Sequence, residues 1–501
     1  MRELRLTLAW IAAAVGAVRR AGGADDVIGD VVTDSRTLRP GDLFVALRGP
    51  RYDGHAFVDD VLERGAAGAI VEQGSVGRNA GSKGQDPAYG GEHAASEGEQ
   101  GRRAGPDLRT RRVPDRRTRL IAVPDTLQAL QRLAHEVRTS VETRVVAITG
   151  SAGKTTTKEA IAALLATRFR VVKNKGNLNN HIGLPLSLMQ LRTAPDVAVM
   201  ELGMNHAGEI STLVAIAAPD VRVWTNVGDA HLGFFASADA IADAKAEILE
   251  QASAATVLVC NADDPRVMER TAGFPGRVLT FGTAEGATIR ARAIRDRGLA
   301  GSSADIDTPA GNTTIETALL GRGNLFNLLA ATAVAIDCGV GLNQIVAEIP
   351  RLQPADRRGA VRQLRAGITL IDDSYNSSPA ALRQALEVVA LEARNRRVIA
   401  VLGEMLELGT HSVALHESCG RAAAAAGVAR LFAVGGAAAR AMAGAAASAG
   451  MPASAVSHFE TSEQAAPAVA AEVVSRDLVL VKGSRGTRTD IVADTLAAEL
   501  G

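Results

Sequence analysis

The sequence predicts an α/β protein with mostly parallel sheets, divided into two or three domains. The chain has 501 residues, more than one ordinary hydrophobic core holds, so several domains are expected. Short apolar runs of strand length alternate with helix-length segments along two stretches, and that alternation is typical of parallel sheets covered by helices. A composition of 47% hydrophobic and 22% charged residues is typical of a soluble globular protein.

The charge balance and the cysteines narrow the class of partner. Lys+Arg and Asp+Glu both number 55, so the formal net charge is zero and no global field attracts nucleic acid or an anionic membrane. We therefore expect small-molecule partners held in local sites. The cysteines Cys260, Cys338 and Cys419 lie far apart without paired spacing. They are interpreted as free thiols of a reducing compartment, which predicts a cytoplasmic protein.

The N-terminal segment predicts an amphipathic helix rather than a signal peptide. Its apolar residues recur at helical spacing, and no small-residue cleavage site follows them; they are Leu4, Leu8, Ile11, Ala12 and Val15. The sequence contains no apolar run of about 18 residues or more, so it predicts no membrane insertion.

Residues 74–117 differ from their surroundings because they are rich in Gly, Ser, Gln, Glu and Arg and nearly free of large apolar side chains. Such a segment cannot bury enough surface to offset its ordering entropy, so we expect a disordered insertion. Its arginines could contact an anion, but a solvated insertion without an assigned role is the preferred interpretation.

After the insertion, two series of strands and helices are expected. Helix-like segments at 124–138 and 156–167 belong to the first series, whose strands are predicted at 120–123, 144–149, 197–200, 221–225 and 257–260. Ala-rich helices separate the strands of the second series, at 368–371, 398–402, 430–434 and 478–481. The boundary between the two series is expected near Pro350 to Pro354, where two prolines interrupt a helix.

A phosphate-binding loop is the strongest single motif. The segment Thr149-Gly-Ser-Ala-Gly-Lys-Thr-Thr-Thr157 stands between a predicted strand and a predicted helix, as such a loop requires. Its glycines let backbone N–H groups point at phosphate oxygens, Lys154 supplies positive charge, and the Thr155 hydroxyl can ligate magnesium. The residues predicted to bind nucleotide are Gly150, Ser151, Ala152, Gly153, Lys154, Thr155 and Thr156.

The spacing of this loop points to a family. Two residues separate Gly150 from Gly153, whereas the common phosphate loop has four residues between its first glycine and the Gly-Lys pair. The pattern G-x-x-G-K-T-T resembles the Mur ligases and the related folylpolyglutamate synthetases. The resemblance implies three domains: a small N-terminal α/β domain that binds a UDP-linked precursor, a central phosphate-loop ATPase domain and a C-terminal Rossmann-like ligase domain. We expect them at 1–123, 124–350 and 351–501.

Three further polar residues extend the resemblance. Glu201 follows the strand predicted at 197–200, and a carboxylate at that end of a parallel strand can hold a metal beside the phosphate loop. Taken alone, Glu201 could equally cap a helix, His231 could be a packed histidine and Lys245 a solvated one. The resemblance implies that Thr155 and Glu201 bind magnesium, and that Lys245, carbamylated by carbon dioxide, binds a second magnesium with His231. It also implies a catalytic set of Lys154, Glu201, His231 and Lys245.

Two motifs in the second half resemble ATP-contacting segments of the family. Gly321-Arg-Gly-Asn-Leu-Phe-Asn327 resembles G-x-x-N-x-x-N, which implies that Asn324 and Asn327 lie near the adenine. A helix start capped by Asn324 is compatible with that role. The resemblance also implies that Asp373 bonds the ribose and that Arg358 contacts ATP. Arg357 competes with Arg358, because this chain has Asp356-Arg357 where the family commonly has Pro-Gly.

The acceptor is indicated by Asp372-Asp-Ser-Tyr-Asn-Ser-Ser-Pro379, which resembles the DDSYN-x-x-P signature of the Mur ligases that add D-alanyl-D-alanine. It implies that Tyr375 and Asn376 lie near the acceptor. The DYAHTP and DNPR motifs of members that add diaminopimelate or lysine are absent from the sequence. Residues 403–409 with His416, and residues 482–486, resemble C-terminal segments of the same dipeptide-adding members.

The other substrate is indicated nearer the N-terminus. Thr33-Asp-Ser-Arg36 and residues 41–47 and 53–55 resemble the UDP-binding domain, which implies that Ser35 and Arg36 contact the uridine diphosphate. Arginine suits that role because its guanidinium can donate two parallel hydrogen bonds to a phosphate. Residues 176–185 resemble a substrate-contacting loop, which implies contacts from Asn179 and Asn180. His181 stands where the family often has an acid and is left unassigned.

Together the resemblances imply an ATP-dependent ligase of peptidoglycan synthesis. It would join D-alanyl-D-alanine to UDP-N-acetylmuramoyl-tripeptide through an acyl phosphate, as a monomer, with two magnesium ions and no nucleic-acid partner. The alternatives are a ligase adding a single amino acid, a folylpolyglutamate synthetase, a phosphate-loop switch or motor, and an inactive scaffold. The acceptor motif and the UDP-type segments disfavour the first two, the loop spacing disfavours the third, and the intact polar set disfavours the last. The sequence does not name the third residue of the tripeptide or the base for the incoming amine.

Overall fold

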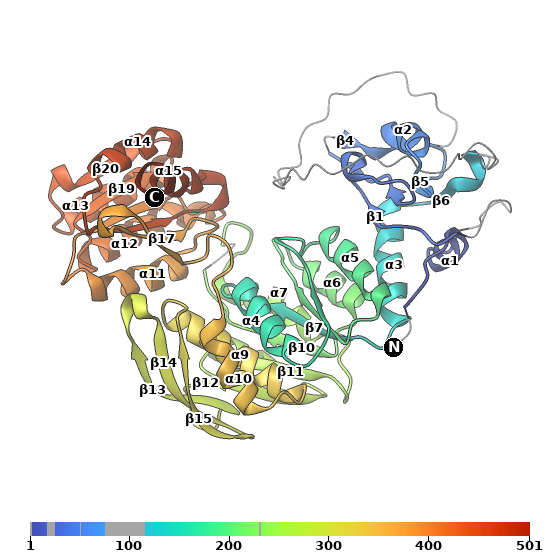
Figure 1. The fold of residues 1–501 in the computed structure, drawn as a ribbon, viewed down its shortest axis with the longest axis horizontal. Helices are drawn as coiled ribbons and strands as arrows, with labels where there is room; N and C mark the ends of the chain where they lie inside the picture. Colours follow the sequence, from blue (N-terminus) through green and yellow to red (C-terminus); the bar gives the residue numbers. More distant parts are fainter. Residues whose placement is uncertain (1–2, 18–25, 51, 76–115, 230–231) are drawn as a thin grey trace. The chain divides into compact units, whose positions relative to one another are not determined.

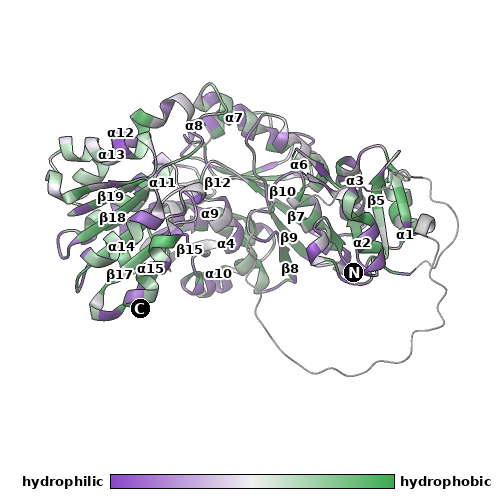
Figure 2. Ribbon diagram, turned by 90° about the horizontal axis from the view of Figure 1, so that it is seen from above, coloured by the Kyte–Doolittle hydropathy of each residue, from purple (hydrophilic) through white to green (hydrophobic). Residues whose placement is uncertain are grey.

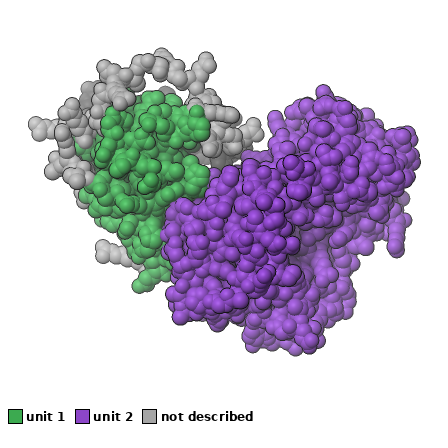
Figure 3. Space-filling view, turned by 180° about the vertical axis from the view of Figure 1, so that it is seen from behind, with its two compact units in different colours: residues 1–142, 181–194 green, residues 143–180, 195–501 purple. Residues whose placement is uncertain are grey.

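The computed structural model describes residues 3–17, 26–50, 52–75, 116–229 and 232–501. The chain forms two compact units, one of residues 1–142 with 181–194 (unit 1) and one of residues 143–180 with 195–501 (unit 2; Figure 3). His231 and most of the predicted insertion lie outside the described residues, so the predictions for them stay predictions. In the part of the chain that the structure describes, no helix is long and apolar enough to cross a membrane.

Unit 1 is built on a four-stranded parallel sheet with the order β1-β2-β5-β6. The predicted N-terminal amphipathic helix is confirmed: Thr7 caps it at Trp10 N (3.2 Å), and Leu8, Ile11 and Ala12 are buried. The strands are β1 (Val31–Val32), β2 (Leu43–Val45), β5 (Gly68–Glu72) and β6 (Leu120–Val123), with a hairpin of β3 (Arg48–Gly49) and β4 (Tyr52–Asp53); the helices are α1 (Leu8–Ala14), α2 (Val58–Glu63), α3 (Thr126–Thr139) and α5 (Gly183–Leu188).

The first sheet of unit 2 has nine strands in the order β15-β14-β13-β12-β11-β10-β7-β9-β8 (Figure 1). Strands β7 to β13 pair in parallel, while β13-β14 and β14-β15 pair antiparallel. The strands are β7 (Arg144–Thr149), β8 (Val171–Lys173), β9 (Val197–Glu201), β10 (Val221–Trp224), β11 (Val257–Asn261), β12 (Arg277–Gly282), β13 (Ile289–Asp296), β14 (Ser302–Thr308) and β15 (Gly311–Thr317); the helices are α4 (Lys154–Ala166), α6 (Glu209–Ala217), α7 (Ala238–Ala246), α8 (Pro265–Thr271), α9 (Arg322–Asp337) and α10 (Leu342–Glu348).

The second sheet of unit 2 has six strands in the order β16-β17-β21-β18-β19-β20, parallel except for the β16-β17 pair. Alternate residues of β18 enter two different cores, one on each face, so helices cover both faces. The strands are β16 (Ala360–Gln363), β17 (Thr369–Asp373), β18 (Val398–Gly403), β19 (Arg430–Val434), β20 (Val456–Phe459) and β21 (Leu478–Lys482); the helices are α11 (Pro379–Glu392), α12 (Ser412–Ala425), α13 (Ala437–Ser448), α14 (Ser462–Glu472) and α15 (Asp490–Leu500).

The predicted α/β class is therefore confirmed, because each of the three main sheets is wholly or mostly parallel. Strands β7 and β19 are mainly apolar after a first arginine, as Figure 2 shows, and such runs are expected of strands covered on both faces; β10 is buried too but contains Arg222. The expected boundaries at 123 and 350 stay predictions. The order β11-β10-β7-β9 matters for function, because it brings the carboxyl ends of four parallel strands to one edge of the sheet.

Candidate nucleotide and metal site

The phosphate loop connects β7 to α4, as the sequence predicts. Gly153 is the N-cap of α4 with φ 82°, and no side chain caps the helix, so α4 begins with backbone N–H groups suited to an anion. A Cβ at Gly153 would overlap Asn327 Oδ1, and a Cβ at Gly150 would overlap Thr225 Oγ1. Glycine is thus favoured at both positions by space and by a positive φ, 150° at Gly150 and 82° at Gly153.

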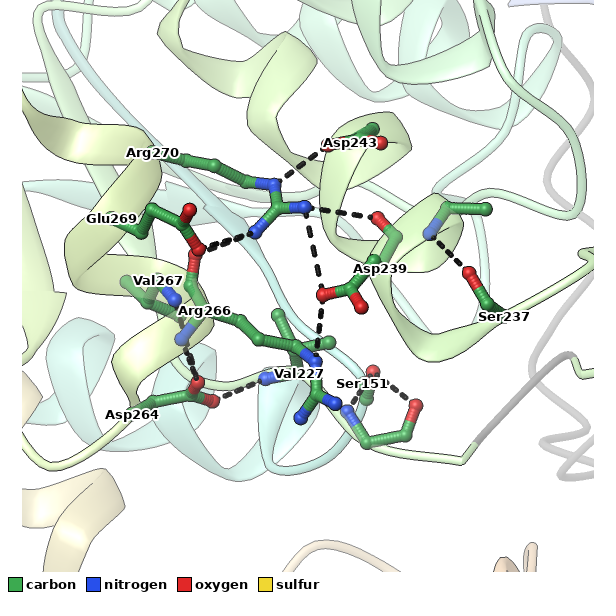
Figure 4. A network of polar contacts seen from close by, with 12 residues as sticks. Ser151, Val227, Ser237, Asp239, Asp243, Asp264, Arg266, Val267, Glu269 and Arg270 are labelled. Atoms are coloured by element: carbon green, nitrogen blue, oxygen red, sulfur yellow. Dashed lines mark hydrogen bonds and ion pairs between the residues drawn. The ribbon is translucent and has the colours of Figure 1, made fainter.

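The loop is held from the side of β10 by two residues that the sequence reading missed. Asn226 Oδ1 accepts from Ala152 N (2.9 Å), Asn226 O accepts from Ser151 N (3.0 Å), and Thr225 Oγ1 donates to Ala152 O (2.8 Å). Ser151 also bonds Gly228, and Asp264 accepts from Val227 N (2.7 Å), as Figure 4 shows. Their position directly after a buried strand was the available signal.

Glu201 and Thr155 form a pair of oxygen donors beside the loop. Glu201 is paired with Ile148 in the sheet, is 4% exposed, and its Oε2 accepts from Thr155 Oγ1 (2.8 Å). Asn179 donates to Glu201 Oε1 (2.8 Å), and the amide of Asn174 bonds the backbone N and O of Glu201. A carboxylate and a hydroxyl at this place are hard oxygen ligands, so they fit a magnesium ion.

The two lysines of the predicted catalytic set differ in their surroundings. Lys154 Nζ donates to Gly150 O (2.8 Å); burial lowers its pKa, an effect that Glu201 opposes. Lys245, in α7, is 1% exposed, and its pKa lies well below the ordinary lysine value because of burial and the nearby charge of Lys154. A lysine with a lowered pKa presents a larger fraction of neutral amine, which is the form that reacts with carbon dioxide.

Asn324 and Asn327 lie at the start of α9, next to the loop. Asn327 Oδ1 accepts from Thr157 Oγ1 (3.2 Å), and Asn327 Nδ2 donates to Asn324 Oδ1 (3.1 Å). A cavity of about 350 Å³ lies on the adjacent side of α4, and it is lined by Thr156, Leu319 and Leu352 among others. Its lining combines alanines with the charged side chains of Glu159, Lys173, Glu348 and Arg351, so the cavity is of mixed polarity.

The predicted C-terminal residues gather at the carboxyl end of β17. Lys482 Nζ donates to Asp373 Oδ2 (2.7 Å) and to Asn376 O (3.1 Å), while burial raises the pKa of Asp373. The guanidinium of Arg358 lies over the Tyr375 ring, 4.3 Å from its centroid. Arg357 instead donates to Asp494 Oδ2 (2.9 Å) on α15, so the two competing arginines have different partners.

The two C-terminal segments that resembled the dipeptide-adding members contact each other. Leu406 N donates to Ser484 Oγ (3.0 Å), and Met405 N donates to Nε2 of the buried His416 (2.8 Å). The other ring nitrogen, Nδ1, donates to Ser412 O (2.7 Å), so His416 is neutral here. His416 thus orients the 403–409 loop.

The predicted UDP contacts lie in unit 1, on the short helix Ser35–Thr37. Arg36 makes a two-pronged bond to Asp34, from Nε to Oδ1 (2.9 Å) and from Nη2 to Oδ2 (2.8 Å). The hydrogen bond from Arg36 is the largest cause of the lowered pKa of Asp34. Ser35 O accepts from Arg64 Nη1 (2.9 Å). The Arg36 guanidinium is half-exposed and therefore accessible to an anion.

The fold and the site define a nucleotide-binding α/β protein of the phosphate-loop type. Three family models match consecutive parts of the chain: the Mur ligase family catalytic domain at residues 27–138, the Mur ligase middle domain at 148–335, and the Mur ligase glutamate ligase domain at 357–485. The chain belongs to the Mur ligase family.

Three similar proteins illustrate how the chain relates to known members of the family. The chain is 31% identical to a UDP-N-acetylmuramoyl-tripeptide–D-alanyl-D-alanine ligase of Bacillus subtilis, over 95% of this chain and 94% of the relative. A crystal structure of MurF from Acinetobacter baumannii is 30% identical and superimposes with a TM-score of 0.81 over 99% of this chain and 100% of that one. MurF ligase from Thermotoga maritima in complex with ADP is 28% identical, with a TM-score of 0.74 over 94% of this chain and 97% of that one.

Proposed function

We propose that this protein is the ATP-dependent ligase that joins D-alanyl-D-alanine to UDP-N-acetylmuramoyl-tripeptide in peptidoglycan synthesis. The observation that carries the proposal is the pairing of an intact phosphate loop and Glu201 with the Asp373–Tyr375–Asn376 cluster, in a chain whose full-length relatives bear that activity. The proposal includes a cytoplasmic monomer with domains at 1–123, 124–350 and 351–501.

The reaction has two bond-making steps. The terminal carboxylate of the tripeptide attacks the γ-phosphorus of ATP, forming an acyl phosphate and releasing ADP. The amine of D-alanyl-D-alanine then attacks the acyl carbon, a proton leaves the nitrogen, and the tetrahedral intermediate expels phosphate to leave the amide. Phosphoryl transfer depends mainly on positioning and charge stabilisation. Lys154 and the uncapped N–H groups at the start of α4 would supply both for the ATP phosphates.

Thr155 and Glu201 would hold one magnesium ion, and His231 with carbamylated Lys245 would hold a second; bound there, magnesium neutralises phosphate charge. The buried Lys245 amine, with its lowered pKa, supports the carbamate because it is poised in the neutral form. Carbamylation would replace this neutral amine by an anion beside the Lys154 cation, which is a favourable pairing of opposite charges.

The remaining residues orient the substrates. We assign Asp373 to the ribose and Arg358 to ATP, with Asn324 and Asn327 near the adenine. Tyr375 and Asn376 would contact the acceptor. The residues assigned to the UDP-linked precursor are Ser35, Arg36, Asn179 and Asn180.

The deciding experiment measures phosphate release by the purified protein with ATP, magnesium and UDP-N-acetylmuramoyl-tripeptide, with and without D-alanyl-D-alanine. We expect release only when both substrates are present, together with a pentapeptide product by mass spectrometry. Release that is indifferent to the dipeptide would reject this acceptor in favour of another Mur-type ligase or a plain NTPase.

Lys245→Ala tests the carbamate. We expect at least about a 100-fold loss of activity, partly restored by added short carboxylic acids that replace the lost oxygen ligand. Lys173→Ala, an exposed lysine on β8, is the control and should keep wild-type activity. Full activity of Lys245→Ala without rescue would refute the carbamate role.

Arg358→Ala and Arg357→Ala separate the competing arginines. Arg358 is engaged with Tyr375 in the cluster, whereas Arg357 is paired with α15, so only Arg358→Ala should raise the KM for ATP, by about tenfold for one charged hydrogen bond. The reverse pattern would transfer the ATP contact to Arg357.

A further inference from the structure

A carboxylate at the end of α7 caps a different helix, α6. Glu247 follows α7 directly, and its Oε1 accepts from Gly208 N (2.6 Å) while its Oε2 accepts from Ser211 N (3.0 Å). Nearby, Ser211 Oγ donates to Glu250 Oε2 (2.6 Å). The start of α6 is thus bonded to Glu247 and Glu250, two of the four residues that follow α7.

Helix α6 needs an external acceptor because its own N-cap offers none. That residue is Gly208, with φ 85° and no side-chain cap. The first N–H groups of a helix otherwise lack partners, and negative charge near them is stabilising. Glu209, inside the first turn, accepts from Asn205 N (2.7 Å) and so supplies charge locally. Glu247 differs from Glu209 in coming from another helix.

The residues after α7 are also bonded to strand β10. Arg222, buried in β10, donates from its guanidinium to the carbonyl oxygens of Ile248 and Glu250. On its outer side, α7 pairs with α8 through Arg270 Nε to Asp243 Oδ1 (2.7 Å) and Arg266 Nε to Asp239 Oδ1 (3.0 Å), as Figure 4 shows. Helix α7 therefore contacts three neighbours, and Glu247 makes the bond to α6.

This bond connects the end of the Lys245 helix to α6, the helix that follows Glu201 in the chain. Glu201 ends β9, and the loop 202–208 runs from it to α6; Lys245 lies two residues before Glu247. Glu201 is fixed in the sheet beside Ile148, so a shift of α7 against α6 would move the Lys245 side chain relative to the Glu201 carboxylate. Metal sites tolerate little such error, and their supporting shell determines affinity.

We infer that Glu247 is a positioning residue, which fixes the Lys245 helix against the loop after Glu201 and so sets the spacing of the proposed metal ligands. The inference rests on the proposed roles of Glu201 and Lys245. It assigns Glu247 no contact with substrate. A role limited to capping α6 would affect stability alone, so metal binding distinguishes the two.

The test compares Glu247→Ala and Glu247→Gln with the matched control Glu209→Gln, which also removes one negative charge from the first turn of α6. Mn²⁺ binding in the presence of ADP is measured by titration with electron paramagnetic resonance detection. Carbamate on Lys245 is measured by ¹³C NMR after incubation with ¹³C-bicarbonate. Thermal unfolding of each variant measures how much stability is lost when the cap of α6 is weakened.

For Glu247→Ala we expect Mn²⁺ affinity to fall by about 10-fold or more and the carbamate signal to weaken, as for other supporting residues of metal sites. Glu247→Gln keeps one acceptor oxygen, so its Mn²⁺ affinity should lie between those of Glu247→Ala and wild type. The Mn²⁺ affinity of Glu209→Gln should stay within about twofold of wild type. If Glu247→Ala does not fold, Glu247→Gln decides by the same measure.

Two results would overturn the inference: Mn²⁺ affinity of the Glu247 variants within about twofold of wild type, or an equal loss in Glu209→Gln. A missing carbamate signal in the wild-type protein would instead reject the proposed carbamylation of Lys245. In that case the Mn²⁺ comparison of Glu247→Ala with Glu209→Gln still decides the role of Glu247.

Discussion

The nucleotide site of unit 2 and the predicted UDP site of unit 1 both present positive charge to phosphate, but they hold it differently. Around Lys154, polar side chains bond to partners far along the chain: Thr155 to Glu201, and Thr157 to Asn327. Around Arg36, the partner is Asp34, two residues away, and the guanidinium is 52% exposed. The first arrangement depends on the folded sheet, and the second is local.

The difference teaches how each site can receive its ligand. Buried polar groups without partners are costly, and Lys154, Thr155 and Thr157 are already bonded within the protein, while the first N–H groups of α4 stay available to an anion. An exposed ion pair contributes only about 0–1 kcal/mol, so Arg36 can exchange Asp34 for a phosphate at small cost. We therefore expect a preformed nucleotide site in unit 2 and, in unit 1, a precursor site whose Arg36–Asp34 pair opens when phosphate binds.

Of the substitutions considered, removal of Lys154 should have the largest effect on activity. A small effect would contradict the contrast between a preformed site in unit 2 and a local one in unit 1. We expect Lys154→Ala to lower kcat by about 1000-fold, as for loss of a preorganised charge-stabilising donor, while far-UV circular dichroism and thermal unfolding stay near wild type. Phosphate release measures the rate, and the exposed Lys173→Ala is the control. A loss below about tenfold would show that the site is not preformed around this charge.

Removing Arg36 should give an intermediate effect, seen in binding of the precursor rather than in the chemical step. Arg36→Ala is expected to raise the KM for UDP-N-acetylmuramoyl-tripeptide by about 10- to 100-fold, the range for a charged hydrogen bond, with kcat little changed. Because the pair is exposed, added salt should weaken precursor binding by the wild-type protein more than by the variant. Arg48→Ala, which removes another ion-paired arginine of unit 1, should leave the KM near wild type. A kcat defect in Arg36→Ala would mean that this residue also belongs to a preformed site.

The smallest expected effect is on the pH dependence of stability, and it tests the buried His416 of unit 2. Burial lowers the pKa of His416, because the protonated ring would be desolvated; it would also lose its acceptor for Met405 N. The stability due to neutral His416 is therefore complete above the unfolded pKa of about 6.5 and is lost as pH falls toward the folded value, at about 1.4 kcal/mol per unit of pKa difference. Urea unfolding of wild type and His416→Gln at about pH 7.5 and 5.5 should show a weaker pH dependence in the variant.

The exposed His411 supplies the control for that experiment, since His411→Gln removes an exposed imidazole from the same segment. Its pH dependence of unfolding should match wild type. Equal pH dependence in wild type and His416→Gln would show that the buried imidazole does not contribute to the acid sensitivity.

The sequence predicted well those features that depend on neighbouring residues. The strands at 120–123, 144–149 and 430–434 have the predicted bounds, and the phosphate loop stands between its strand and helix. Apolar runs and glycine turns are local signals, so they can be recognised without knowing which strands pair.

Features that depend on partners distant in the sequence were not predicted. The bonds of Asn226 to Ala152 and of Glu247 to α6 join residues brought together only by the strand order β10-β7-β9 and by helix packing. The antiparallel strands β13 to β15 were also missed, because their alternating polar residues, such as Arg290 and Arg292, are weaker signals than the apolar runs of the central strands.

The composition of unit 1 has a consequence for the order of synthesis. Residues 181–194 complete this unit, although residues 143–180, which precede them, belong to unit 2. Within unit 1, α5 packs against α3, and Leu4 N donates to Arg192 O (2.8 Å). On the ribosome, unit 1 therefore cannot be finished before β7, α4 and β8 have emerged. A fragment ending at residue 142 would leave the apolar face of α3 uncovered, so the two units must mature interleaved rather than one after the other.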